Sequence, residues 1–164
     1  MAQGIAYLDG PRLRRCLTAG LQRLIDQREY LNRINVFPVP DGDTGNNLAH
    51  AALVGQQSLA AAGSTSAGDI LEALAAAVLD AAQGNSGALL AQFLQGLTES
   101  TAAQQRLNTT EFAAAMNNAA ATTRLALAAP REGTILSVID ASARAAEYYA
   151  DSDDFTVLLP AMVS

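Results

Sequence analysis

Two acidic residues separated by a single glycine dominate the most polar loop of this sequence. Asp41 and Asp43 lie within Asn35–Asn47, which reads NVFPVPDGDTGNN and holds two prolines and two glycines that disfavour regular structure. Carboxylates held this close suit Mg²⁺, which prefers oxygen ligands and completes its shell with water or phosphate oxygens. We predict that Asp41 and Asp43 bind a divalent cation, with the side-chain carbonyl of Asn35 as a third ligand. The alternative, that both carboxylates only cap a turn and the following helix, stays open at this point.

Two shorter segments place glycines and hydroxyl groups at predicted helix starts. Gly84–Gly87, which reads GNSG, and Gly133-Thr134 each precede an apolar helical pattern. Free backbone N–H groups and the helix dipole make such a helix start suitable for an anion. Each segment alone is equally typical of a plain helix cap. Beside the acidic loop, the two segments predict a pocket for a nucleotide and Mg²⁺.

The elements that would position these loops are helices. Apolar residues recur every three or four positions in seven segments, the spacing of amphipathic helices. These segments are 11–30, 46–62, 70–81, 89–97, 111–127, 135–139 and 155–162. We predict an all-α fold, an up-and-down antiparallel bundle or barrel. The loops after the first, third and fifth helices of such a bundle lie at the same end, so the three loops should converge.

Composition excludes several classes of protein. All ten basic residues are arginine, which excludes a Walker A loop, a protein kinase fold and any Schiff-base mechanism, since each needs a lysine. A formal charge of −6 disfavours nucleic-acid binding. With one histidine and one cysteine, the chain has neither a His₃ or Cys₄ zinc site nor an internal disulfide.

The single cysteine and the absence of targeting patterns bear on the compartment. Cys16 falls between Leu13 and Leu17 on an apolar stripe, so we predict a buried thiol. The sequence shows neither a signal-peptide pattern nor an apolar stretch long enough to span a membrane. We therefore expect a cytoplasmic protein. His50, two turns into a predicted helix, is expected to be structural or to face solvent.

The motifs resemble a known family. Asn35–Asn47 closely resembles the signature of the nucleotide-binding domain of bacterial fatty acid kinases, which is related to the DhaL-type subunit of dihydroxyacetone kinases. Gly84–Gly87 and Glu132–Leu136 fall where that family has its second and third conserved loops. The resemblance covers essentially the whole chain. It implies a barrel of antiparallel amphipathic helices that binds ATP or ADP, with two Mg²⁺ ions between the phosphates and the protein.

The resemblance also assigns residues. Asp41 and Asp43 become the metal ligands, joined by Asn35 near the place of a third aspartate in the dihydroxyacetone kinase branch. The polar and glycine positions that match the family's nucleotide contacts are Thr44, Gly45, Asn47, Gly84, Asn85, Ser86, Gly87, Gly133 and Thr134. Asn46 stands where the family usually has threonine. No catalytic base is assigned.

The functional expectation is a phosphotransferase. The fatty acid kinase branch implies transfer of a phosphoryl group from ATP to the carboxylate of a fatty acid presented by a DegV-type carrier protein. The alternatives are a dihydroxyacetone kinase nucleotide-binding subunit and a non-catalytic nucleotide-binding or interaction module. The Phe-Pro-Val-Pro sequence favours the fatty acid branch.

The end of the chain carries a further expectation. The related family continues into a last helix and a glycine-rich segment, so we expect residues 1–164 to form a single domain that is incomplete at its C-terminus, with seven of eight helices. The apolar faces of the first helix and of the Phe155–Met162 segment should then stay partly exposed. We therefore expect self-association or marginal stability.

Overall fold

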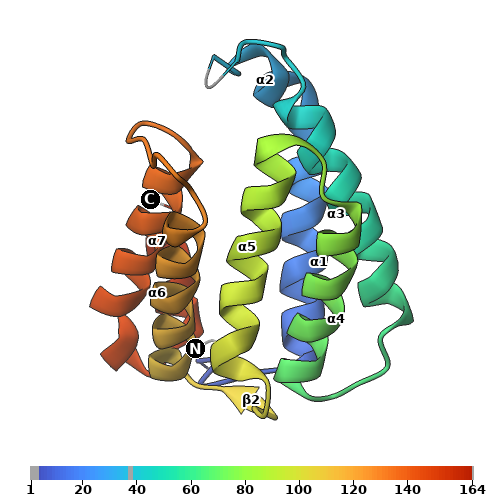
Figure 1. The fold of residues 1–164 in the computed structure, drawn as a ribbon. Coiled ribbons are helices and arrows are strands. Elements are labelled where there is room, and N and C mark those ends of the chain that lie inside the picture. The colour runs from blue at the N-terminus through green and yellow to red at the C-terminus, as the bar shows by residue number, and fades with distance from the viewer. Residues whose placement is uncertain (1–3, 37–38, 164) are drawn as a thin grey trace.

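Helices make up nearly all of the fold. The computed structural model describes residues 4–36 and 39–163, and within them the chain forms an antiparallel helical bundle (Figure 1). Its helices are α1 (Gly10–Asp26), α2 (Arg28–Arg33), α3 (Thr44–Ala61), α4 (Ala67–Ala81), α5 (Gly84–Thr101), α6 (Thr109–Leu125), α7 (Ile135–Tyr148) and α8 (Phe155–Ala161), with a 3-10 turn at Ala150–Ser152. The predicted all-α bundle is confirmed. The predicted first helix is divided at Gln27, so the described residues hold eight α-helices where the sequence predicted seven.

Two very short strands close the end of the bundle opposite α2. Strand β1 (Leu8–Asp9) pairs antiparallel with β2 (Arg106–Leu107), which lies between α5 and α6 (Figure 1). The sequence predicted no strand here, because two residues are too few to show strand alternation. The pairing fixes the N-terminal segment against the α5–α6 connection.

Small side chains allow the helices to approach closely. Helix α3 packs between α1 and α4, α5 packs on α4 and α6, and α7 packs on α6. Their contacts bury alanine and leucine, among them Ala52, Leu59, Leu74 and Ala119, none more than 1% exposed. None of the helices in the described ranges is long and apolar enough to cross a membrane.

The burial predictions meet different outcomes. The prediction of a buried Cys16 is wrong: α1 buries Leu13 and Leu21 and packs on α3 and α4, whereas Cys16 lies on an exposed part of the helix. The expectation of a partly exposed Phe155–Met162 segment holds in part: Phe155 and Leu158 are 1% and 0% exposed, whereas Val157 is 46% exposed and Leu159 and Met162 are half-buried. The Phe155 ring meets Phe112 of α6 edge to face, with ring centroids 5.6 Å apart.

Asp154 joins the two ends of the chain. Its Oδ1 atom accepts hydrogen bonds from the backbone N–H of Ile5 (2.9 Å) and of Thr156 (2.9 Å), and so caps α8. Hydrogen bonds from the backbone and hydroxyl of Thr156 and from the Ile5 backbone hold the pKa of Asp154 below its ordinary value of 3.8.

Asp154→Ala is therefore expected to lower the melting temperature at neutral pH. Because the folded-state pKa is depressed, the charged carboxylate stabilises the fold at pH values above the unfolded pKa. That contribution is lost as the pH falls through the folded pKa. Thermal melts from pH 7 down to about pH 2.5 should show the difference between the two proteins shrinking. A difference that stays constant with pH would contradict this role for the charge.

Candidate functional site

The three predicted loops lie at one end of the bundle. The connections before α3, α5 and α7 all lie at the end that carries α2 (Figure 1). Among the described residues, the glycines with positive φ are Gly42 (69°) and Gly133 (76°), which lie in two of these connections, and Gly84 (59°), the first residue of α5. The topology therefore collects the loops as the sequence predicted.

Among the described residues, one carboxylate of the acidic loop accepts no hydrogen bond. The Asn35 Nδ2 group donates to Oδ1 of Asp41 at 2.7 Å, which orients that carboxylate. Asp43 occupies the N-cap position of α3, but its side chain makes no capping hydrogen bond. The alternative in which Asp43 serves as a helix cap is therefore wrong for this structure. Gly42 between them adopts a left-handed conformation that places the two aspartates on a tight turn.

The start of α3 is held by a residue that the sequence analysis missed. The Oδ1 atom of Asn32 in α2 accepts from the backbone N–H of Asn46 at 3.1 Å, and its Nδ2 donates to Asn46 Oδ1 at 3.2 Å. Asn32 lies 14 residues before Asn46, and no local spacing rule links the two. The one feature of the sequence that could have indicated this role of Asn32 is its amide side chain a few residues before the acidic loop.

The second loop touches the first. The Ser86 hydroxyl donates to the backbone carbonyl of Thr44, with an oxygen–oxygen distance of 3.5 Å. Gly84 faces Asn47 so closely that a Cβ atom at Gly84 would lie 2.5 Å from the Asn47 Nδ2 atom. The N-terminal ends of α3 and α5 are therefore adjacent. Asn85 is exposed, and Gly87 is buried beside Ala82.

The starts of α3 and α5 differ from most other helix starts in this structure because their N-cap side chains make no hydrogen bond to the first turn. Helices α1, α4, α6, α7 and α8 each begin with a side chain that accepts a hydrogen bond from the first turn. Gln83 precedes α5 and makes no such bond, and the same holds for Asp43 before α3. Uncapped N–H groups at a helix start attract anions. At α3 the Asn32 side chain already bonds the N–H of Asn46, which leaves the N–H groups of Thr44 and Gly45 without a capping bond among the described residues. Together with the adjacent start of α5, these groups can bind the oxygens of a phosphate group.

The third loop is more fully bonded. Thr134 caps α7 by accepting from Leu136 N–H at 3.3 Å, and its hydroxyl donates to the Arg131 carbonyl at 2.8 Å. The Gly133 N–H donates to the Ser137 hydroxyl at 2.9 Å. These bonds of Gly133 and Thr134 stay within the loop and the first turn of α7. The first and second loops are therefore in direct contact, and the third loop lies at the same end of the bundle.

Gly84→Ala is expected to affect binding more than stability. The left-handed backbone costs alanine about 1–2 kcal/mol, and the new methyl group displaces Asn47. We expect a modest drop in melting temperature and a clear loss of nucleotide affinity, measured by calorimetry. Gly20→Ala is the comparison, since Gly20 lies within α1, outside the three loops, and its Cβ would have no neighbouring atom within 4 Å. Unchanged affinity in Gly84→Ala would contradict the role of the α3–α5 junction.

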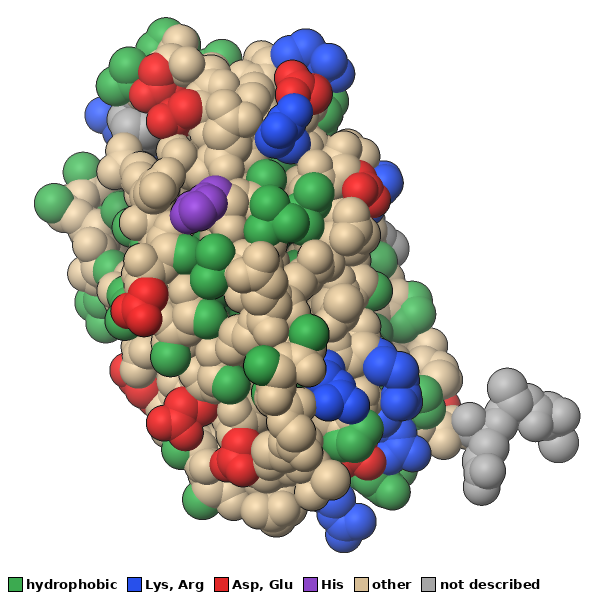
Figure 2. All heavy atoms as spheres, turned by 90° about the vertical axis from the view of Figure 1, so that its right-hand side faces the viewer, with side chains coloured by type: hydrophobic (Ala, Val, Ile, Leu, Met, Phe, Trp, Pro, Cys, Tyr) green, Lys and Arg blue, Asp and Glu red, His purple; other side chains and the backbone are tan. Residues whose placement is uncertain are grey.

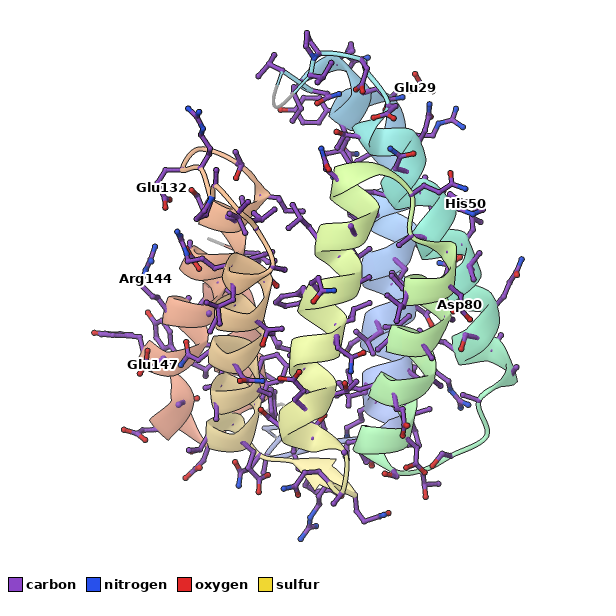
Figure 3. The ribbon with its side chains drawn as sticks, in the orientation of Figure 1. Glu29, His50, Asp80, Glu132, Arg144 and Glu147 are labelled. Carbon is purple, nitrogen blue, oxygen red and sulfur yellow. The ribbon has the colours of Figure 1, made fainter. Side chains whose placement is uncertain are left out.

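The donor set fits a hard divalent cation. Asp41, Asp43 and Asn35 offer two carboxylates and an amide oxygen, and Mg²⁺ accepts such ligands together with water and phosphate oxygens. Within the described ranges, no group of three or more histidine, cysteine or acidic residues is arranged to hold a metal on its own. His50 is exposed on the outer side of α3 and points away from the bundle (Figures 2 and 3), which confirms that it faces solvent.

Fold and site together define a helical domain with oxygen-rich loops gathered at one end. Residues 38–164 match the sequence model of the DAK2 domain. The chain belongs to the DAK2 domain family, which consists of dihydroxyacetone kinase-like nucleotide-binding modules. The family resemblance found in the motifs is thereby confirmed.

Curated relatives extend well beyond this domain. The chain is 34% identical to protein YloV of Bacillus subtilis over 159 residues, covering 96% of the chain and 29% of YloV. It is 30% identical over 159 residues to an uncharacterized protein of Staphylococcus saprophyticus, covering 97% of the chain and 29% of that protein. An uncharacterized protein of Staphylococcus haemolyticus is 30% identical over 150 residues, with 92% and 27% covered. The chain spans less than a third of the length of these relatives.

Proposed function

We propose that this chain binds ATP or ADP with Mg²⁺ at the α3–α5 junction. We further propose that it transfers a phosphoryl group to the carboxylate of a fatty acid presented by a DegV-type carrier protein. The observation that carries the proposal is the adjacency of the starts of α3 and α5, where neither N-cap side chain, Asp43 or Gln83, bonds the first turn. Asn32 bonds one N–H group of α3, and the carboxylate of Asp43 borders the remaining ones. Membership of the DAK2 family supports nucleotide as the ligand. The Phe-Pro-Val-Pro sequence before Asp41 supports the fatty acid branch.

The residues have distinct tasks in this proposal. Asp41 and Asp43 hold the cations, two in number by the family resemblance, and Asn35 orients Asp41 and offers its amide oxygen. Bound Mg²⁺ would neutralise charge on the phosphates and on the transferring group. The N–H groups at the starts of α3 and α5 bind the phosphate oxygens, with Thr44 and Ser86 beside them. Gly133 and Thr134 border the phosphates from the third loop.

The chemistry of the acceptor fits the residues of the site. A carboxylate oxygen attacks the γ-phosphorus of ATP, the bond from that phosphorus to the ADP oxygen breaks, and the products are an acyl phosphate and ADP. A carboxylate is already deprotonated at neutral pH, so the step requires no general base. His50, whose side chain points outward from α3, takes no part. Because ATP is the donor, we propose that the reaction takes place in the cytoplasm.

A trapping assay tests the proposal. The chain is incubated with Mg·ATP, a long-chain fatty acid and a purified DegV-type carrier, and hydroxylamine converts any acyl phosphate to a hydroxamate. We expect hydroxamate only when chain, ATP and carrier are all present. Phosphorylation of dihydroxyacetone in place of the fatty acid would overturn the acceptor and favour the other kinase branch. Nucleotide binding without transfer to either acceptor would identify a non-catalytic binding module.

A further inference from the structure

A network of charged side chains ties the third loop to the two helices that flank it. Arg124 near the end of α6 donates to the carboxylates of both Glu132 in the loop (2.9 Å) and Asp140 in α7. Glu132 in turn accepts from the Ser137 hydroxyl at 2.7 Å, and that same hydroxyl accepts from the Gly133 N–H at 2.9 Å. The chain of contacts therefore runs from α6 through Glu132 and Ser137 to the backbone of Gly133.

The network is arranged to fix the loop more than to stabilise the fold. Glu132 lies at the loop end of α7 (Figure 3), and its side chain is 71% exposed, so its ion pair with Arg124 contributes little to global stability. The Asp140 side chain is only 20% exposed and anchors the guanidinium against α7. The Ser137 hydroxyl, followed by Arg124, holds the pKa of Glu132 below its ordinary value, so the carboxylate stays charged at neutral pH.

The position of the network points to a role in ligand binding. Gly133 adopts a left-handed conformation, and no atom lies within 4 Å of where its Cβ would be. Packing therefore does not hold this residue in place. The hydrogen bond that its N–H donates to the Ser137 hydroxyl and the capping bond of Thr134 hold it, and Glu132 and Arg124 orient Ser137 in turn. A loop fixed before the ligand arrives does not have to be ordered during binding, which improves affinity.

We propose that Arg124 is a positioning residue that holds Glu132 and Asp140 together and thereby fixes the Gly133–Thr134 backbone for contact with nucleotide phosphates. The inference rests on the proposed nucleotide site and adds a residue outside the three loops. Arg124 itself does not touch the ligand in this account. It acts through Glu132 and Ser137.

Four variants test the network in the full 164-residue chain. Arg124→Met removes both ion pairs, and Ser137→Ala removes the link between Glu132 and Gly133 without a change in charge. Arg124→Lys keeps a cation that can pair with Asp140. Arg144→Met is the charge control, because Arg144 on α7 points away from the bundle (Figure 3) and acts on Glu132 through its charge, with none of these hydrogen bonds. Each protein is examined by hydrogen exchange without ligand and by calorimetric titration with Mg·ADP.

We expect the amides of residues 131–134 to exchange about tenfold faster in Arg124→Met and Ser137→Ala. Mg·ADP affinity should fall about tenfold in both variants. Arg124→Lys should recover most of that affinity, and the Arg144→Met control should match the unmodified chain. Melting temperatures should change little, which separates positioning from a merely structural role.

The outcomes are distinguishable. Unchanged exchange at residues 131–134 in Arg124→Met would overturn the network as a determinant of loop order. Faster exchange with undiminished Mg·ADP affinity would overturn its role in binding, as would a loss that Arg124→Lys fails to recover at all. If the unmodified chain fails to bind Mg·ADP, the proposed function itself falls. Binding by the unmodified chain and equally by Arg124→Met overturns only the positioning role.

Discussion

Asp41→Ala and Asp43→Ala should each weaken Mg²⁺-dependent ADP binding by about 100-fold or more. Loss of an outer-shell partner alone costs a metal site about 10–100-fold, and these residues are proposed as direct ligands. Neither carboxylate is part of the core, since Asp43 makes no capping bond and the exposed Asp41 accepts its hydrogen bond from Asn35, which lies in the same loop. Circular dichroism and melting temperature should therefore stay nearly unchanged while calorimetry shows the loss.

Glu147→Ala is the control for removal of a negative charge. Glu147 lies near the end of α7 away from the three loops and points outward (Figure 3). Its removal should leave Mg·ADP affinity unchanged. Full Mg²⁺-dependent binding in both aspartate variants would eliminate the metal assignment.

Gly45→Val should disrupt the start of α3 more than any other substitution considered. Gly45 is buried against α2, and a Cβ atom there would lie 2.0 Å from the backbone oxygen of Arg28 and 2.8 Å from Oδ1 of Asn32. Backbone atoms cannot rotate away as a side chain can, so α2 must move off α3. We expect a loss of roughly 3 kcal/mol in the free energy of unfolding, the upper part of the range for overpacking. Nucleotide binding should be lost with it.

Gly20→Ala is the matched control. Gly20 lies within α1, and no atom comes within 4 Å of where its Cβ would be. Alanine is the better helix former, so the variant should gain up to about 1 kcal/mol. Chemical denaturation of the two variants beside the unmodified chain gives both differences. Equal stability of Gly45→Val and the unmodified chain would show that α2 does not pack on α3 as described.

Local signals in the sequence predicted the helices well. Asp9 followed by Pro11 is a pattern typical of a helix start, and the structure shows Asp9 as the N-cap of α1. Asn108 and Glu111 have the spacing of a capping box, which is present before α6. The period of the apolar residues predicted the remaining helices, because burial along one face requires that spacing. The sequence did not predict the division between α1 and α2 at Gln27, because the apolar pattern continues through this position into α2.

Contacts between distant residues account for what the sequence did not reveal. The apolar stripe of α1 includes Cys16, but burial of Cys16 depends on where α3 and α4 pack. Asn32 acts on Asn46 and Arg124 acts on Asp140 across 14 and 16 residues. Residue spacing in the sequence predicts contacts only between side chains that are a few positions apart on the same helix or turn. The aspartate and glycine motifs could be recognised in the sequence because the residues of each motif are consecutive or nearly so in a single loop.

One titration tests the central claim most directly. Isothermal calorimetry of the 164-residue chain with ADP is performed with Mg²⁺ present and again after its removal by chelation. The proposed site predicts saturable binding of one ADP per chain with Mg²⁺ and a large loss of affinity without it, since the aspartates then repel the phosphates uncompensated. Absence of ADP binding with Mg²⁺ present, or equal affinity in its absence, would contradict the account of the α3–α5 junction as a nucleotide–Mg²⁺ site.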